Sequence, residues 1–314
     1  MPSTIQIPMP MTIAIKYARL PNGRVHFYQH WMPDSPRALA VFVHGLGDHI
    51  GRTGALVSRL TSRGIACALF DQQGHGRSDG RRGHVERFSD WVNDLAGFVQ
   101  FSQMSAPSDT PLFIIGQSLG ALVGLNFILT HTAPIAGMVA ISAAIFPTVK
   151  IPEWKKKLGR KLFRIWPTIS MDDGIRIEDL TRSEAEREAL RSDALFHRRL
   201  TLCAATEIER NLELVMAMPH RIHAPMLMLA GSSDRVCDPE GTRQFATRLS
   251  STDKSCRVYP GMFHDLLHDT GCDVVLDDIE AWIEVQASRP TQKDRQFALH
   301  RRETLWEDVS PSSA

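Results

Sequence analysis

The sequence lacks an excess of charge of either sign, a long apolar run and any closely paired cysteines. Its 36 lysine and arginine residues are balanced by 35 acidic residues, so no overall positive field gathers nucleic acid, and we expect no nucleic-acid partner. No stretch approaches the ~20 apolar residues of a membrane-spanning helix, and residues 1–6 lack the basic start of a signal peptide. These absences predict a soluble cytoplasmic protein.

The five cysteines are odd in number and scattered, and none lies in a C-x-x-C motif. This usage fits reduced thiols better than a disulfide scaffold or a zinc site, so we expect neither a metal nor a cofactor. Cys237 has two interpretations, a small buried apolar residue or a thiol that modifying reagents reach. The five are Cys67, Cys203, Cys237, Cys256 and Cys272.

What the chain has instead is an alternation of short apolar strands with amphipathic helices. After three strand-like segments the alternation runs to about residue 146, and it resumes after residue 218. This pattern predicts an α/β protein with a mostly parallel sheet and helices on both faces. The expected strands are residues 13–17, 25–30, 38–43, 65–70, 112–115, 135–142, 226–230 and 255–259, and the expected helices are residues 89–103, 121–130, 239–249 and 274–284.

The middle of the chain has a different pattern. Residues 147–218 carry charged patches and no strand-like run. We therefore expect a core of residues 1–146 and 219–287, a helical cap of residues 147–218 and a polar C-terminal tail of residues 288–314. An insertion of this kind lies over the carboxyl ends of the strands, where open α/β folds bind their ligands.

One pentapeptide carries the strongest chemical signal. Residues 116–120 read G-Q-S-L-G and stand between the apolar run 112–115 and a helical pattern. A strand, a G-x-S-x-G turn and a helix in this order form a nucleophile elbow, whose strained serine needs neighbours without a Cβ. The pattern predicts Ser118 as a nucleophile, although the same pentapeptide also occurs in ordinary turns.

A serine nucleophile needs a histidine base and a carboxylate, which follow it in the order Ser, Asp, His in this architecture. Asp234 comes directly after the predicted strand 226–230, and His264 follows the strand 255–259, so both lie at the same sheet edge as Ser118. Asp238 is an alternative acid, but its place before Pro239 is typical of a helix N-cap.

A second alternative gives His264 a different role, because His264 and His268 have the spacing of two metal ligands on one helix face. No glutamate follows the first histidine as in H-E-x-x-H, and no third ligand is apparent, so we favour the triad.

Two backbone N–H groups are candidates for the oxyanion hole. Leu119 follows the nucleophile, and Leu46 follows the His-Gly step at the end of the strand 38–43. The segment 71–78 resembles a dinucleotide loop, but its glycine spacing fails the G-x-G-x-x-G pattern. We interpret it as a structural turn in which His75 is a hydrogen-bonded scaffold residue.

Together these motifs resemble the monoacylglycerol lipase and lysophospholipase branch of the α/β-hydrolase superfamily. The resemblance covers roughly residues 13–287 and rests on the motif at residues 44–49, the turn at 74–78, the elbow, the segment 231–238 and the loop with His264. It implies the α/β-hydrolase fold, with Ser118, Asp234 and His264 as the triad and with Leu46 and Leu119 as oxyanion donors.

The resemblance also implies a pocket for the alcohol part of the ester. It places Asp48 and Arg52 beside this pocket and Cys237 near the catalytic aspartate. Two positions depart from the family: Gln117 stands where the animal lipases have histidine, and Ala121 stands where many relatives have glycine. Gln117 is still able to hydrogen-bond a glycerol hydroxyl.

Residues 153–166 of the expected cap combine apolar residues at helical spacing with many basic ones. A basic amphipathic helix either lies on an anionic membrane or packs its apolar side on the protein body. We keep both interpretations, the first of which makes the protein a peripheral membrane protein.

The sequence therefore predicts a serine hydrolase that cleaves monoacylglycerol to glycerol and fatty acid through an acyl-enzyme. Its expected partner is a small lipid ester, and nothing in the sequence indicates an oligomeric state. The alternatives are a lysophospholipase, a short- or medium-chain carboxylesterase and, from another class, a ligand-binding protein of the same fold without turnover.

Overall fold

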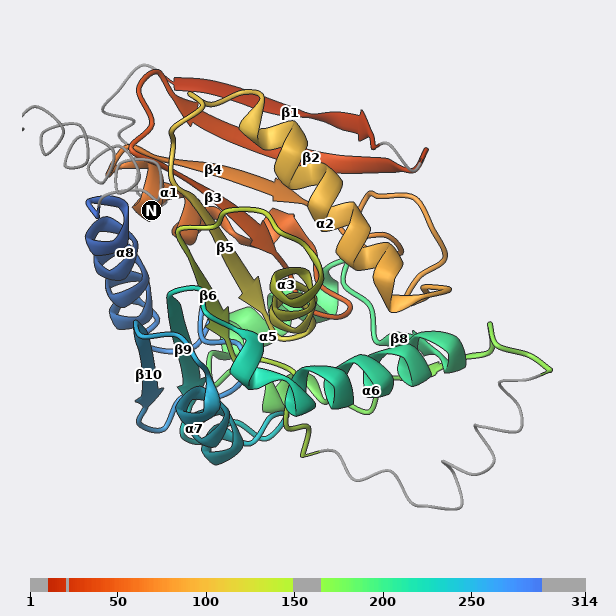
Figure 1. Cartoon of the computed structure of the whole chain (residues 1–314). Coiled ribbons are helices and arrows are strands. Elements are labelled where there is room, and N and C mark those ends of the chain that lie inside the picture. Colours follow the sequence, from red (N-terminus) through yellow and green to blue (C-terminus); the bar gives the residue numbers. More distant parts are fainter. Residues whose placement is uncertain (1–10, 21–22, 149–164, 290–314) are drawn as a thin grey trace, which may run out of the picture.

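An eight-stranded sheet forms the centre of the computed structural model, which describes residues 11–20, 23–148 and 165–289 (Figure 1). Its strand order is β1-β2-β4-β3-β5-β6-β9-β10. β2 is antiparallel to both of its neighbours, β1 and β4, and the other adjacent pairs are parallel. The strands are β1 (Met11–Arg19), β2 (Val25–Pro33), β3 (Ala38–Val43), β4 (Ile65–Phe70), β5 (Leu112–Gln117), β6 (Gly137–Ile141), β9 (Met226–Gly231) and β10 (Lys254–Tyr259).

Helices cover both faces of this sheet, and each face has its own apolar core. One core joins the sheet to α2, α3, α6 and α7, and the other joins it to α1 and α8. Successive residues of a strand point to opposite faces, so Ile114 belongs to the first core and Phe113 to the second. The helices are α1 (Gly54–Thr61), α2 (Phe88–Gln103), α3 (Leu119–Thr130), α6 (Leu202–Ala217), α7 (Pro239–Arg248) and α8 (Asp273–Ala287).

The central strands are buried along their whole length, as parallel strands between two helical layers are. Their continuous apolar runs explain why the sequence located them within a few residues. The prediction of an α/β-hydrolase fold with a mostly parallel sheet is confirmed. Helix α1 was not predicted from the sequence.

The insertion between β6 and β9 is not wholly helical, which corrects the expectation for this segment. Its described part contains a two-stranded antiparallel sheet of three-residue strands, too short to leave a periodic signal in the sequence. The residues 153–164 of the basic segment and 290–314 of the tail lie outside the described residues. The elements are β7 (Ser170–Asp172), α5 (Glu184–Ser192) and β8 (Arg199–Thr201). Short 3-10 helices are formed by Ile50–Arg52 after β3, by Ile177–Asp179 between β7 and α5, and by Pro219–Arg221 before β9.

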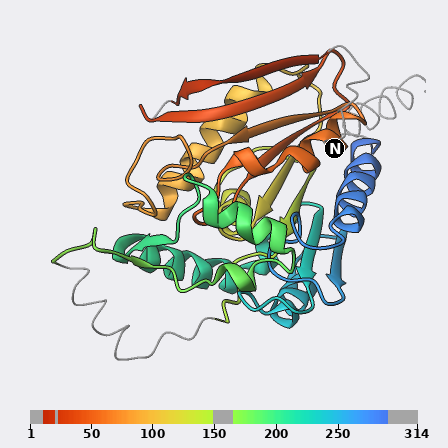
Figure 2. The ribbon, with the colours of Figure 1, turned by 180° about the vertical axis from the view of Figure 1, so that it is seen from behind.

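The insertion crosses the carboxyl end of the sheet (Figures 1 and 2). The His197 N–H donates to the carbonyl oxygen of Gly47, just past β3, at 2.9 Å. The Thr201 N–H donates to the carbonyl oxygen of Gly83 at the same distance. A Cβ on Gly47 would lie 2.0 Å from the carbonyl oxygen of His197, so the chain passes closely enough to require glycine. The insertion is therefore part of the surroundings of the candidate site.

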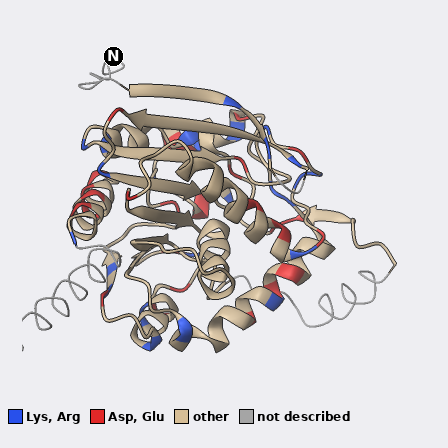
Figure 3. Ribbon diagram, turned by 45° about the horizontal axis from the view of Figure 1, so that its top comes forward, with Lys and Arg blue, Asp and Glu red and all other residues tan. Residues whose placement is uncertain are grey.

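Basic and acidic residues are interspersed around the molecule in Figure 3, which agrees with the balanced composition. None of the described helices combines the length and the apolar character required to cross a bilayer.

Candidate active site

Ser118 occupies a strained turn between β5 and α3. Its φ is 52° and its ψ is −117°, and it is one of two non-glycine residues with positive φ in the described ranges. The turn fits because its neighbours are small: a Cβ on Gly116 would lie 2.6 Å from Ala121 Cα, and one on Gly120 would lie 2.0 Å from the carbonyl oxygen of Val43. Both glycines of the pentapeptide are therefore required by packing as well as by the turn.

The structure brings Ser118, His264 and Asp234 into one hydrogen-bonded chain. His264 Nε2 lies 2.9 Å from Ser118 Oγ, and Nδ1 lies 2.8 Å from Asp234 Oδ2. An ionised carboxylate only accepts hydrogen bonds, so Nδ1 carries the proton and Nε2 is free to accept from the serine hydroxyl. Asp234 Oδ1 is held by the N–H groups of Val236 and Cys237 at 2.8 and 2.9 Å. This geometry is the one that a serine nucleophile requires of its base and its orienting acid.

Nearby negative charge stabilises the protonated form of His264. Burial lowers the pKa of His264, but the Asp234 carboxylate outweighs burial, with a smaller contribution from Asp265, and the pKa is raised above 6.5. The same carboxylate would stabilise the imidazolium formed when His264 takes the serine proton.

The loop after β3 lies against Ser118, since a Cβ on Gly45 would be 3.3 Å from Ser118 Cβ. His44 holds this loop: Nδ1–H donates to the Gly45 carbonyl oxygen at 2.8 Å, and Nε2 accepts from the Gln72 N–H at 2.9 Å. These bonds require a neutral imidazole, and burial lowers the pKa of His44 accordingly.

Both candidate oxyanion donors are adjacent to this contact. Leu46 follows Gly45, and Leu119 follows Ser118. Within the described part of the chain, neither N–H donates a hydrogen bond to another residue. Two available donors next to the Ser118 hydroxyl are what an oxyanion developing there would require.

Asp48 and Arg52, expected beside the alcohol pocket, lie in a buried ionic network. Arg52 Nη1 lies 3.1 Å from Asp48 Oδ2, and Nη2 lies 3.0 Å from Asp265 Oδ2 and 3.5 Å from Glu186 Oε2. The network thus connects the loop after β3 with the loop that carries His264 and with α5 of the insertion.

Asp265 and His268 complete this network. Asp265 was not predicted from the sequence as part of a site, and His268 was considered there only as an alternative metal ligand. His268 Nδ1 lies 2.8 and 2.9 Å from the two carboxylate oxygens of Asp265, and its Nε2 lies 2.9 Å from the carbonyl oxygen of Arg52. Both partners accept, so both ring nitrogens donate and the imidazole is protonated. Burial lowers the pKa of His268, but Asp265 raises it to a net value of about 8.

Gln117, in the nucleophile elbow, also forms a hydrogen bond with the Asp265 carboxylate. Its Nε2 donates to Asp265 Oδ1 at 2.8 Å, across 148 residues of sequence, and both side chains are buried. No motif contains this pair, and the only sequence signal for Asp265 is its place directly after His264.

Comparisons with known proteins agree with this geometry. The protein family described as "Serine aminopeptidase, S33" matches residues 34–271. The monoglyceride lipase of Rattus norvegicus is 30% identical over 86% of this chain and 91% of its own length. The chain belongs to the monoacylglycerol lipase branch of the α/β-hydrolases.

Solved structures and a second relative extend this finding. The crystal structure of Paleococcus ferrophilus monoacylglycerol lipase superposes with a TM-score of 0.76 at 28% identity, covering 83% of this chain and 99% of that one. The Mycolicibacterium smegmatis monoacylglycerol lipase is 27% identical over 82% of this chain and 91% of its own length. The resemblance of the motifs to this branch of the α/β-hydrolases is thereby confirmed.

Three residues with alternative interpretations have clear positions in the hydrolase. Asp238 is the N-cap of α7, accepting from the Glu240 N–H at 3.0 Å, as its place before Pro239 indicated. His75 is buried, donates from Nδ1 to the Gln73 carbonyl oxygen at 3.0 Å and stacks on His197. Cys237 is buried beside Asp234, and burial raises the pKa of its thiol well above the usual value, which favours its interpretation as a small buried apolar residue.

The metal interpretation of His264 and His268 has no support in the geometry, because both ring nitrogens of each histidine lie at hydrogen-bond distance from other protein atoms. Among the described residues, no group of three histidine, cysteine or acidic side chains is arranged to hold a metal ion.

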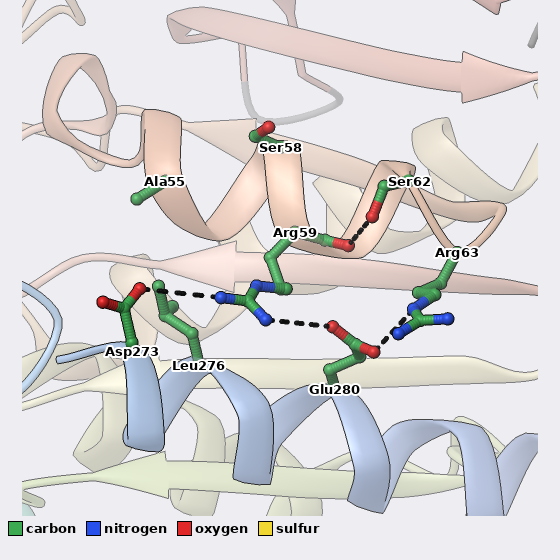
Figure 4. Close-up of a pocket in the computed structure, with 8 residues that line it drawn as sticks. All are labelled: Ala55, Ser58, Arg59, Ser62, Arg63, Asp273, Leu276 and Glu280. Carbon is green, nitrogen blue, oxygen red and sulfur yellow. Dashed lines mark hydrogen bonds and ion pairs between the residues drawn. The ribbon is translucent and has the colours of Figure 1, made fainter. Parts of the chain in front are cut away.

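A hollow of about 620 Å³ between α1 and α8 contains none of these candidate residues (Figure 4). Its arginines are already paired: Arg59 lies 3.6 Å from Asp273 and 3.8 Å from Glu280, and Arg63 lies 2.6 Å from Glu280. Neither cation is left to bind an anionic ligand, so we do not assign this hollow to the substrate.

The raised pKa of His264 predicts the acid limb of the pH profile. Below its pKa the imidazolium cannot accept the serine proton, so kcat/KM on a p-nitrophenyl ester falls with a midpoint above 6.5. Asp234→Asn removes the charge that raises this pKa, so the midpoint moves down and kcat falls on the order of 10⁴-fold. Asp238→Asn, four residues away, is the matched control and keeps the wild-type profile. Equal effects of the two variants would show that Asp234 is not the orienting acid.

The raised pKa of His268 predicts how stability depends on pH. Because its pKa is 6.5 when unfolded and about 8 when folded, its stabilisation is complete below 6.5 and is lost as the pH rises through 8. This shift corresponds to about 2 kcal/mol. In urea unfolding, the advantage of the wild type over His268→Gln should shrink by about this amount between about pH 6 and about pH 9.5. His220→Gln, at an exposed position, is the control and should show no such change.

Proposed function

We propose that the protein hydrolyses monoacylglycerol to glycerol and a free fatty acid through an acyl-enzyme on Ser118. The observation that carries the proposal is the hydrogen-bonded chain from Ser118 Oγ through His264 to Asp234 at the carboxyl end of the sheet. The sequence relatives named as monoglyceride or monoacylglycerol lipases support the choice of substrate.

Acylation begins when Ser118 Oγ attacks the ester carbonyl carbon and its proton passes to His264 Nε2. The imidazolium that forms is stabilised by Asp234 through the bond at Nδ1. Negative charge develops on the carbonyl oxygen, and the N–H groups of Leu46 and Leu119 are placed to stabilise it. The ester bond then breaks, and His264 gives its proton to the departing glycerol oxygen.

Deacylation repeats these steps with water. His264 Nε2 takes a proton from a water molecule, which attacks the acyl carbon, and the proton then returns to Ser118 Oγ as the fatty acid leaves. No step requires a cofactor.

An ester agrees better than a peptide with the charges beside Gln117. Peptidases that act on a free N-terminus need a carboxylate for the α-amino group. Here Asp48 is paired with Arg52, and Asp265 is paired with both Arg52 and His268. Asp48 and Asp265 are therefore already paired with cations of the protein, and the third carboxylate of the network, Glu186, also lies 3.5 Å from Arg52.

A substrate panel tests the proposed function. Wild-type protein should turn over monoacylglycerol faster than a lysophospholipid with the same acyl chain, and faster than a simple short-chain ester. Ser118→Ala removes the nucleophile and should lower kcat on the order of 10⁶-fold. Ser105→Ala, at an exposed position, is the matched control. Equal turnover by Ser118→Ala would overturn the mechanism, and faster turnover of lysophospholipid would change the substrate.

We also propose that the insertion brings the enzyme to an anionic lipid surface. Trp166 and Ile165 are 57% and 65% exposed, and Ile169 and Met171 are exposed as well. Ile165 and Trp166 are the last two residues of the basic amphipathic segment 153–166, and Ile169 and Met171 follow it. Apolar anchors next to basic residues are typical of peripheral membrane contact.

Vesicle co-sedimentation tests this contact. Changing Lys155, Lys156 and Arg160 to Glu should reduce binding to vesicles that contain anionic lipid, because each basic residue contributes about 1 kcal/mol near such a surface. The same charge change at the exposed positions Lys16, Arg19 and Arg243 is the control and should leave binding unchanged. Undiminished binding of the first variant would exclude the segment as the docking surface.

A further inference from the structure

The pair formed by Gln117 and Asp265 fixes the orientation of an amide next to the nucleophile. Gln117 is the last residue of β5 and directly precedes Ser118. Its Nε2 donates to Asp265 Oδ1 at 2.8 Å. Both side chains are buried, so water does not compete readily for this bond.

Asp265 determines which end of the amide faces it. Burial raises the pKa of Asp265, but His268 and Arg52 outweigh burial and lower it well below the usual value, so the carboxylate is ionised. An ionised carboxylate offers only acceptors. The glutamine amide must therefore present its NH₂ group to Asp265, and the reverse orientation would place two oxygens against each other.

The carbonyl oxygen of Gln117 is consequently left as an acceptor. It makes no hydrogen bond to any described residue, and it is not among the fully enclosed polar atoms that lack a partner. It belongs to the residue next to Ser118, so a substrate group that reaches it lies close to the reacting ester. An acceptor that has no protein partner and lies close to the reacting ester favours substrates that carry a hydrogen-bond donor there, such as a free hydroxyl.

We infer that Asp265 is a positioning residue that fixes the Gln117 amide with its carbonyl oxygen as the acceptor for a free hydroxyl on the alcohol part of the ester. The enzyme thereby distinguishes esters of polyols from esters of simple alcohols. The inference rests on the proposed ester hydrolysis, and it assigns the discrimination to a pair of residues that no motif contains.

The rest of the network explains why the arrangement is stable. Asp265 Oδ2 is held by Arg52, and His268 bridges both carboxylate oxygens. The Asp265 N–H also donates to the carbonyl oxygen of Leu180 in the insertion at 2.7 Å. The carboxylate therefore cannot turn away from Gln117 without breaking several bonds.

The test compares two esters of the same fatty acid, 1-monoacylglycerol and the propyl ester, which lacks the free hydroxyls. The measured quantity is the ratio of their kcat/KM values, which does not depend on the fraction of folded enzyme. Gln117→Met removes the acceptor at similar volume and should lower this ratio about 10-fold, the effect expected for one hydrogen bond worth about 1.4 kcal/mol.

Asp265→Asn tests the positioning role. An asparagine amide can present either its oxygen or its nitrogen to Gln117, so it no longer dictates the orientation. The ratio of the two kcat/KM values should fall, but by less than in Gln117→Met. The change should appear as a higher KM for monoacylglycerol. Gln103→Met and Asp109→Asn, at exposed positions, are the matched controls and should keep the wild-type ratio.

The outcomes separate this inference from the proposed function. If wild-type protein hydrolyses both esters and the two variants lose activity equally on both, Gln117 and Asp265 are only structural and the inference is wrong. If wild-type protein hydrolyses neither ester, the proposed function itself fails. A fall of the ratio in Gln117→Met alone would keep Gln117 as the acceptor and overturn the positioning role of Asp265.

Discussion

The strained backbone of Ser118 depends on contacts with three neighbouring strands and loops. A non-glycine residue at φ 52° and ψ −117° costs about 1–3 kcal/mol, and it persists only where its surroundings hold it. Here the Ser118 N–H donates to the carbonyl oxygen of Ile141 at 2.9 Å, and its carbonyl oxygen accepts from Ala144 at 3.2 Å. Gly120 lies against the end of β3. The parallel sheet thus keeps the hydroxyl of Ser118 at its edge, and the loops that follow β3, β9 and β10 meet there.

Because the site lies at the ends of buried parallel strands, part of it could be predicted from the sequence. Parallel strands buried on both faces are continuous apolar runs, so their positions, and the residues directly after them, are visible in the sequence. Asp234 and His264 were found in this way, from their place after β9 and β10. Helix α1 and the three-residue strands β7 and β8 were not, because short elements carry little periodicity and depend on tertiary packing.

The network around Asp265 could not be predicted for a different reason. Gln117, Arg52 and Asp265 belong to three loops or strand ends that are far apart in sequence, and no fixed spacing relates them. Single-residue patterns give the position of each side chain on its own element but not its partner across the sheet edge. The family resemblance placed Arg52 near the alcohol pocket and marked Gln117 as a departure, but only the three-dimensional structure shows that both bind one carboxylate.

Three histidines at this edge have different protonation states because their partners differ. His44 bonds one acceptor and one donor of the backbone, which fits a neutral ring, and burial lowers its pKa. His268 bonds two acceptors, which fits a cation, and its pKa is raised to about 8. His264 faces a carboxylate on one side and a serine hydroxyl on the other, and a hydroxyl can donate or accept. Of the three, only His264 has partners that satisfy both the neutral and the charged ring, which is the property a general base needs when it takes up and releases a proton in one catalytic cycle.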